Sequence, residues 1–182
     1  MNLPNGLSLF RLFVTAFFIL VAAYGQYRLA LALFVLQAVS DLLDGFFARR
    51  MGTKTILGAY LDPLADKVML ASAYIVLSLR GMIPTLLCAV VIVRDIVIAA
   101  GFLIILKRGL KMSPAPSFIS KTTTVFQMVT IVYVLLWSAQ LLWSAQGSLK
   151  PFFFYATAVL TLASGLQYVY MGGAVLFRKE AV

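Results

Sequence analysis

The sequence predicts an all-α polytopic membrane protein with six transmembrane helices. Hydrophobic residues make up 63% of the 182 positions, and the mean hydropathy is +1.00. Apolar runs recur along the chain at close to the length of about twenty residues that a helix needs to cross a bilayer. Because this composition extends over the whole chain, we expect a single transmembrane domain at residues 1–182.

The first three spans are expected at residues 8–25, 30–50 and 63–80. The first ends at the turn signal Tyr24-Gly25-Gln26 and the third at Arg80-Gly81, because glycine commonly ends helices. The second ends in the polar stretch SDLLDGFFARR, and a connection at residues 51–62 is expected to follow it.

The last three spans are expected at residues 83–106, 121–143 and 152–176. The loop at 107–120 separates the first two of them, because KRGLKMSPAPSFISK holds two prolines and three serines. The segment from Gly147 to Pro151 separates the last two. The repeat LLWSAQLLWSAQ places two tryptophans where an interfacial aromatic belt is expected, and we assign it no function.

The positive charges are distributed unevenly over this topology. Twelve of the fifteen Lys and Arg residues fall on one side, and only Arg28, Arg80 and Lys150 fall on the other. Cytoplasmic loops carry an excess of such residues, so both termini and both longer connections are expected in the cytoplasm. The net charge of +9 is then explained by these loops and by anionic lipid rather than by nucleic acid. The first apolar run follows no basic segment, so we expect an uncleaved protein of the inner or plasma membrane.

Four of the six acidic residues gather near the cytoplasmic ends of the second and third spans. Asp41 and Asp44 are three positions apart, and Asp62 and Asp66 are four apart, so each pair shares one helix face. On neighbouring antiparallel helices the two pairs are expected to converge. Ionised carboxylates in low dielectric need a compensating cation, and oxygen ligands without any histidine select Mg²⁺, Mn²⁺ or Ca²⁺ rather than zinc. The sequence therefore predicts a site for one or two such ions.

Eight residues at fixed gaps extend this pattern over 26 positions: Asp41-x2-Asp44-Gly45-x2-Ala48-Arg49-x8-Gly58-x3-Asp62-x3-Asp66. The pattern resembles the signature of the CDP-alcohol phosphotransferases, and the family is also similar to this chain in length and in its six spans. The resemblance implies transfer of a phosphatidyl group from CDP-diacylglycerol to an alcohol, with release of CMP at the cytoplasmic face. It also implies a homodimer.

The resemblance implies a role for each residue of the pattern. Asp41, Asp44 and Asp62 would hold two metal ions, with Asp66 close to them and acting as the general base. The remaining residues of the pattern would bind the donor, with Arg49 on the diphosphate and three small residues lining the cytidine pocket: Gly45, Ala48 and Gly58.

Two acceptor alcohols are implied by different parts of the chain. The segments RDIVIAAGF and PSFISK resemble members that use phosphatidylglycerol and make cardiolipin, and this is the acceptor we favour. The alternative is glycerol-3-phosphate, because NLPNGLSLFR and KTTTVFQM resemble members that use it. Those members typically read Gly-Lys-x-Lys-Thr near the second segment. This chain keeps Lys121 but has Ser120 in place of the glycine and Thr123 in place of the second lysine.

Further cationic residues are candidates for binding lipid or acceptor phosphate. Arg94 is expected to face the cavity and to point away from its neighbour Asp95, or else to pair with one of the site aspartates. Lys121 is expected to contact a headgroup phosphate. A divalent-cation transporter remains the alternative of a different class, although its acids would be spread through the bilayer rather than gathered at one end.

Overall fold

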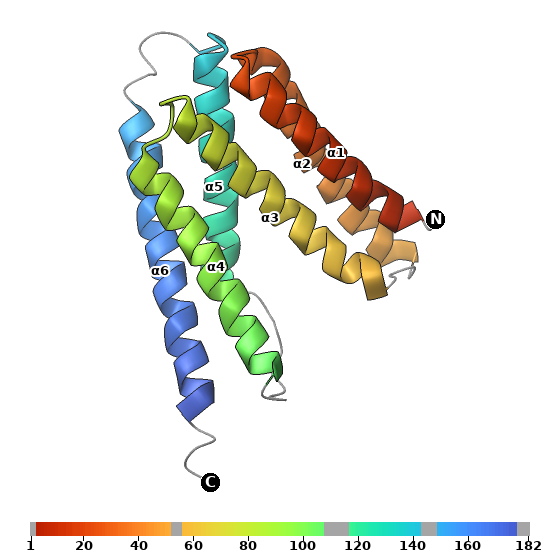
Figure 1. The fold of residues 1–182 in the computed structure, drawn as a ribbon, viewed down its shortest axis with the longest axis vertical. Coiled ribbons are helices and arrows are strands. Elements are labelled where there is room, and N and C mark those ends of the chain that lie inside the picture. Colours follow the sequence, from red (N-terminus) through yellow and green to blue (C-terminus); the bar gives the residue numbers. More distant parts are fainter. Residues whose placement is uncertain (1–2, 52–55, 108–116, 143–148, 178–182) are drawn as a thin grey trace. The chain divides into compact units, whose positions relative to one another are not determined.

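A computed structural model describes residues 3–51, 56–107, 117–142 and 149–177. Side chains are described at residues 10–40, 65–101, 103–104, 117–142 and 149–172. Figure 1 shows that the described residues form α-helices and no strand: α1 Leu3–Ala23, α2 Tyr27–Met51, α3 Ile56–Leu79, α4 Thr85–Lys107, α5 Phe118–Ser138 and α6 Lys150–Phe177. The all-helical class predicted from hydropathy is therefore confirmed over this part of the chain.

Among the residues that the structure describes, two helices are long and apolar enough to cross a membrane, at Phe118–Ser138 and Lys150–Gly172. Two shorter apolar helices lie at Phe10–Ala23 and Tyr27–Ser40. Membrane crossing by all six helices stays a prediction from the sequence.

The predicted turns lie where glycine adopts a backbone conformation that other residues avoid. Gly25 has a φ of 78° between α1 and α2, and Gly81 has a φ of 70° between α3 and α4. In this region a side chain with a Cβ is strained, so glycine is the residue that ends each helix most easily. Both breaks were predicted correctly.

Several predicted boundaries were wrong, and α1, for example, begins at Leu3 rather than at residue 8. The connection expected at residues 51–62 is shorter, because α2 continues to Met51 and α3 already begins at Ile56. Hydropathy marks the apolar part of a helix, whereas backbone hydrogen bonds continue through the polar turns that contain Gly58 and Asp62. The fifth span was extended to residue 143, but α5 ends at Ser138 and Gln140 has a φ of 59°.

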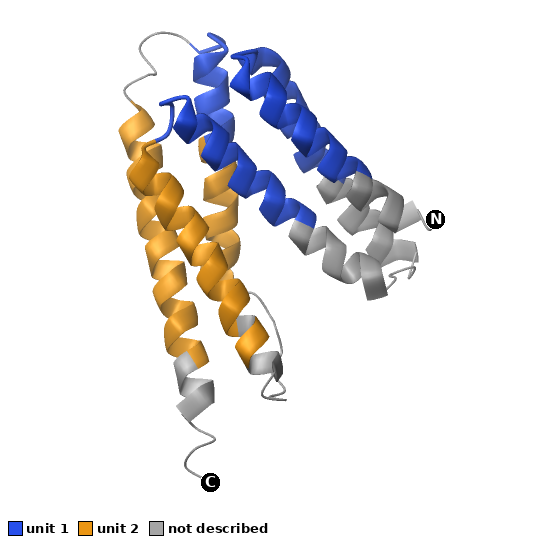
Figure 2. Cartoon of the chain, in the orientation of Figure 1, with its two compact units in different colours: residues 1–83, 131–148 blue, residues 84–130, 149–182 orange. Residues whose placement is uncertain are grey.

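The chain divides into two compact units, coloured separately in Figure 2. Unit 1 comprises residues 1–83 and 131–148, and unit 2 comprises residues 84–130 and 149–182. The division falls within α5, which contributes to both units. Whether the chain acts as one domain over residues 1–182 stays a prediction.

Unit 1 is built on α1, which packs against both α2 and α3. The buried positions of α1 recur every three or four residues: Arg11, Val14, Thr15, Phe18, Val21 and Ala22. This spacing places them on one face of the helix. Phe18 meets Phe34 of α2 with ring centroids 5.9 Å apart, so aromatic contact closes the apolar part of this interface.

Unit 2 differs because many of its buried positions are polar. In this unit α4 packs against α6. The buried residues of α5 in this unit are Ser120, Thr123, Gln127 and Thr130, and those of α6 are Thr157, Thr161 and Ser164. Hydroxyl and amide groups are typical of helix interfaces in membranes, where apolar contact with lipid competes with apolar contact between helices.

Candidate active site

Most of the predicted site residues lie outside the described side chains. Asp41, Asp44, Gly45, Ala48 and Arg49 belong to α2, and Gly58 and Asp62 belong to α3, but only the helical backbone is described at these positions. The uninterrupted helices keep each acidic pair on one helical face. The convergence of the two pairs stays a prediction. Among the described side chains, no group of three or more His, Cys, Asp or Glu residues is placed to hold a metal ion.

Asp66 is the one predicted metal ligand whose side chain is described. Its Oδ1 accepts a hydrogen bond from Nη1 of Arg11 at 2.6 Å. The Asp66 side chain is 31% exposed, whereas the Arg11 side chain is 4% exposed. A charge-assisted hydrogen bond of this length is strong and restricts the rotation of the carboxylate. The arginine on α1 therefore orients the predicted general base on α3.

Arg11 is itself held by residues on α1 and α2. Thr15 donates its hydroxyl to the main-chain oxygen of Arg11 at 2.8 Å. Gln37 donates its Nε2 amide to the same oxygen at 2.9 Å and to Oγ1 of Thr15 at 3.0 Å. Arg11, Thr15 and Gln37 are all buried, so these contacts form in a site of low dielectric. We call these residues, together with Asp66, the Arg11 network.

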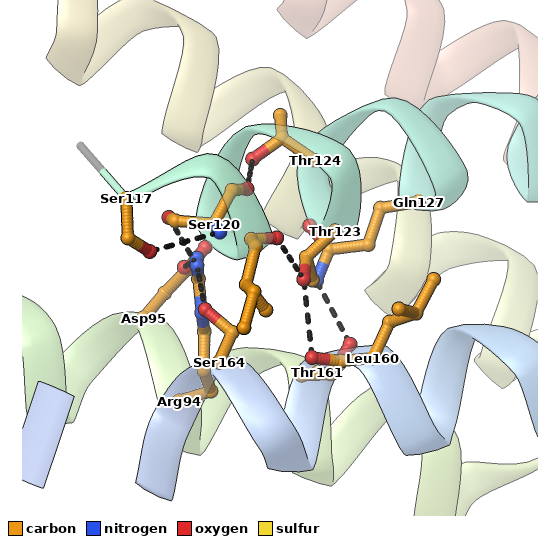
Figure 3. Close-up of polar contacts among 11 residues, drawn as sticks. Arg94, Asp95, Ser117, Ser120, Thr123, Thr124, Gln127, Leu160, Thr161 and Ser164 are labelled. Atoms are coloured by element: carbon orange, nitrogen blue, oxygen red, sulfur yellow. Dashed lines mark hydrogen bonds and ion pairs between the residues drawn. The ribbon is translucent and has the colours of Figure 1, made fainter. Parts of the chain in front are cut away.

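A second polar cluster lies in unit 2 around Arg94 (Figure 3). Nη1 of Arg94 donates to Oδ1 of Asp95 at 2.7 Å. Nη2 donates to the hydroxyl oxygens of Ser120 on α5 and Ser164 on α6, each at 2.7 Å. The guanidinium of one buried arginine on α4 thus joins three helices. We call these four residues the Arg94 cluster.

The expectation that Arg94 and Asp95 point in different directions was wrong. Successive helical positions do diverge at their Cα atoms, but the long arginine side chain bends back far enough to reach its neighbour. The alternative expectation was that Arg94 pairs with one of the site aspartates. Within unit 2 its carboxylate partner is Asp95, which is not a site aspartate. The buried charge of Arg94 is therefore balanced locally.

Hydroxyl and amide contacts continue along α5 and α6 beyond the Arg94 cluster. The hydroxyl of Thr123 donates to the carbonyl oxygen of Leu160 at 3.1 Å, and Gln127 donates to Thr161 at 3.2 Å. Figure 3 shows both contacts bridging the two helices. Thr123 occupies the position where the glycerol-3-phosphate pattern has a lysine, and its buried hydroxyl holds α5 against α6 there. The neighbouring Lys121 is exposed.

Sequence reasoning did not detect the role of Gln37. One signal was available, because Gln37, Asp41 and Asp44 follow one another at spacings of four and three and so share a face of α2. A glutamine in an otherwise apolar helix requires a hydrogen-bond partner, and that requirement marks a helix contact. The identity of the partner depends on which helix packs there.

The chain was compared with protein families and with curated proteins. The sequence model of a family described as CDP-alcohol phosphatidyltransferase matches residues 1–177. A protein of Escherichia coli (strain K12) is 38% identical, with 92% of this chain and 93% of the relative covered. A protein of Sodalis glossinidius (strain morsitans) is 39% identical, with 97% and 98% covered. Both carry the name CDP-diacylglycerol–glycerol-3-phosphate 3-phosphatidyltransferase.

Proposed function

Because the chain belongs to the CDP-alcohol phosphatidyltransferase family, we propose that it transfers the phosphatidyl group of CDP-diacylglycerol to glycerol-3-phosphate and releases CMP. The observation that carries this proposal is the identity of 38–39% with relatives of that name over nearly the whole chain. Membership of a transferase family also removes the cation transporter as an alternative.

The comparisons favour glycerol-3-phosphate over phosphatidylglycerol, the acceptor preferred from short segments of the sequence. Segments such as PSFISK cover a few positions, whereas the likeness to the named relatives extends over at least 92% of the chain. Cardiolipin formation is therefore not the function we propose.

Four carboxylates supply the proposed metal site: Asp41, Asp44, Asp62 and Asp66. The donor set suits a hard divalent ion, because oxygen ligands are present and the sequence contains no histidine. The described part of the site is compatible with this use, since the Asp66 side chain is 31% exposed and can be reached by an ion. Two bound Mg²⁺ or Mn²⁺ ions would neutralise charge on the diphosphate and on the departing CMP.

Asp66 is proposed to act as the general base. As the acceptor hydroxyl oxygen bonds to the phosphorus, the Asp66 carboxylate takes the hydroxyl proton and the phosphorus–oxygen bond to CMP breaks. The contact with Arg11 supports this role, because it fixes the direction of the carboxylate.

The remaining residues of the pattern are proposed to bind the donor. Gly45, Ala48 and Gly58 would allow close approach of the cytidine, because they leave little side chain on the helix surface. Arg49 would bind the diphosphate, because its planar guanidinium can donate two parallel hydrogen bonds to a phosphate group.

Arg94 and Lys121 are proposed to bind the phosphate of the acceptor. Lys121 is exposed and so needs no rearrangement to meet a phosphate. Arg94 is buried and already donates to Asp95, Ser120 and Ser164, so it would have to exchange one of these partners for the phosphate. We therefore assign the first contact with the acceptor to Lys121.

A membrane location is supported by the family and by the two long apolar helices. We propose that the active site faces the cytoplasm, because twelve of the fifteen cationic residues gather on that side of the predicted topology. Both termini would then be cytoplasmic. The homodimer implied by the resemblance stays a prediction.

The proposal is tested by giving the purified protein CDP-diacylglycerol with either glycerol-3-phosphate or phosphatidylglycerol and identifying the lipid product by mass. We expect phosphatidylglycerol phosphate and one CMP per lipid formed. Cardiolipin as the product, with glycerol-3-phosphate left unused, would overturn the acceptor. Failure to release CMP with either alcohol would overturn the reaction itself.

A further inference from the structure

Gln37 makes two hydrogen bonds that join α1 to α2 within unit 1. Its side chain is 2% exposed, and its Nε2 donates to the main-chain oxygen of Arg11 and to the hydroxyl oxygen of Thr15. Both amide hydrogens are used in this way. Because a buried amide is costly to leave without partners, the two contacts select one rotation of α1 against α2.

The oxygen that Gln37 contacts belongs to the residue that holds Asp66. Thr15 lies one turn after Arg11 on α1 and donates to the same main-chain oxygen, so two side chains from two helices converge on one atom. These contacts hold the main chain of Arg11 in place. Because the side chain starts from this main chain, they also limit where its guanidinium can lie relative to α3. The guanidinium then meets the Asp66 carboxylate at 2.6 Å.

We infer that Gln37 and Thr15 are positioning residues for the transfer reaction, acting on Asp66 through Arg11. The inference rests on the proposed role of Asp66 as the proton acceptor. The Arg11 network links α1, α2 and α3, and the last two of these helices carry all four proposed site carboxylates.

A positioning role makes a specific kinetic prediction. Neither Gln37 nor Thr15 contacts substrate in the proposal, so replacing them should lower kcat and leave KM for both substrates unchanged. Small displacements of a catalytic group are known to have large effects on rate, because proton transfer requires the two atoms within hydrogen-bond distance. A merely structural role would lower the melting temperature without this separation of kcat from KM.

The test compares Gln37→Leu with Gln127→Leu in the purified full chain in lipid-detergent micelles. Gln127 is the matched control, because it is also buried and donates its amide to a threonine hydroxyl, but in unit 2. Gln37→Leu removes both hydrogen bonds, and we expect it to lower kcat about tenfold with KM changed less than about twofold, because a misdirected carboxylate slows proton transfer. Gln127→Leu should keep the wild-type kcat with a similar fall in melting temperature.

Thr15 provides a second comparison with a conservative rescue. Thr15→Val removes the hydroxyl at nearly constant shape and should lower kcat. Thr15→Ser keeps the hydroxyl and should have a kcat close to that of the wild type. Unchanged kcat in Gln37→Leu, an equal loss of kcat in Gln127→Leu, or an effect confined to KM would each overturn the inference.

A measurement independent of turnover separates this inference from the proposed function. Spin labels at the exposed positions Phe13 on α1 and Val68 on α3 report the distance between the helices that carry Arg11 and Asp66. Gln37→Leu should broaden the distance distribution and Gln127→Leu should not. If the wild-type protein releases no CMP, the proposed function fails. An unchanged distribution in Gln37→Leu overturns the positioning role, whether or not the protein turns over.

Discussion

Asp66→Asn tests the assignment of the general base most directly, because it removes the charge and the proton affinity while keeping nearly the same shape. The amide retains one oxygen that can accept from Nη1 of Arg11, now 2.6 Å away. Asn cannot take a proton from an attacking hydroxyl under ordinary conditions. The substitution therefore separates the chemical role of the side chain from its part in packing.

The structure limits the stability cost of this change. The Asp66 side chain is 31% exposed, so its attraction to Arg11 is partly screened, but the Arg11 side chain is 4% exposed and keeps its charge. We therefore expect Asp66→Asn to lower the free energy of unfolding by about 1–3 kcal/mol. Against a typical free energy of unfolding of about 5–15 kcal/mol, that loss leaves nearly all molecules folded. Loss of a general base lowers kcat by about 10²–10⁴, or about 3–5 kcal/mol in the barrier. The expected loss of activity is far too large to arise from unfolding.

The assay measures CMP release with saturating CDP-diacylglycerol and glycerol-3-phosphate, alongside the melting temperature. Asp95→Asn is the matched control, since Asp95 also accepts from an arginine, at 2.7 Å, and takes no part in the proposed proton transfer. Because Asp95 holds Arg94, its substitution should act on KM for glycerol-3-phosphate, and kcat at saturating substrate should stay near that of the wild type. Turnover by Asp66→Asn at more than about a tenth of the wild-type rate would refute the assignment of Asp66 as the base.

Two further predictions concern the metal ions and the Arg94 cluster. Excess chelator should stop CMP release, and added Mg²⁺ or Mn²⁺ should restore it, because the proposed ligands are carboxylates; activity that persists in chelator would reject the metal site. Ser164→Ala should lower the free energy of unfolding by about 1–2 kcal/mol, because the buried hydroxyl accepts from the charged Arg94. Ser72→Ala should change it by less than about 0.5 kcal/mol, because Ser72 donates to Met69 of its own helix, and equal effects of both substitutions would contradict this reasoning.

In both units, hydrogen-bonding side chains occupy buried positions between helices that apolar residues usually fill. In unit 1, Gln37 and Thr15 meet at the oxygen of Arg11, and in unit 2 Thr130 and Thr157 lie 2.7 Å apart between α5 and α6. Leucine packs as well against lipid as against another helix, so apolar contact selects helix partners weakly in a membrane. Directed hydrogen bonds select one rotation of each helix. This precision is needed where a carboxylate must meet a reacting hydroxyl.

The sequence by itself determined the helical class, the breaks at Gly25 and Gly81, and the spacing of the acidic pairs. These features are local, because a helix is set by hydrogen bonds four residues apart and a turn by the freedom of one glycine. The family also followed from a local pattern, eight residues within 26 positions. The prediction of the helix ends near Met51 and Ser138 was less accurate, because hydropathy reports burial in lipid rather than backbone hydrogen bonding.

Only the tertiary structure decided which side chains meet. Arg11 and Asp66 are 55 positions apart, and Arg94 and Ser164 are 70 apart, so no spacing rule within a helix could pair them. A buried charge requires a partner, and the sequence shows that requirement, but several aspartates and serines in this chain could meet it. The packing of α1 against α2 and α3, and of α4 against α6, selects among them by bringing particular faces within hydrogen-bond distance.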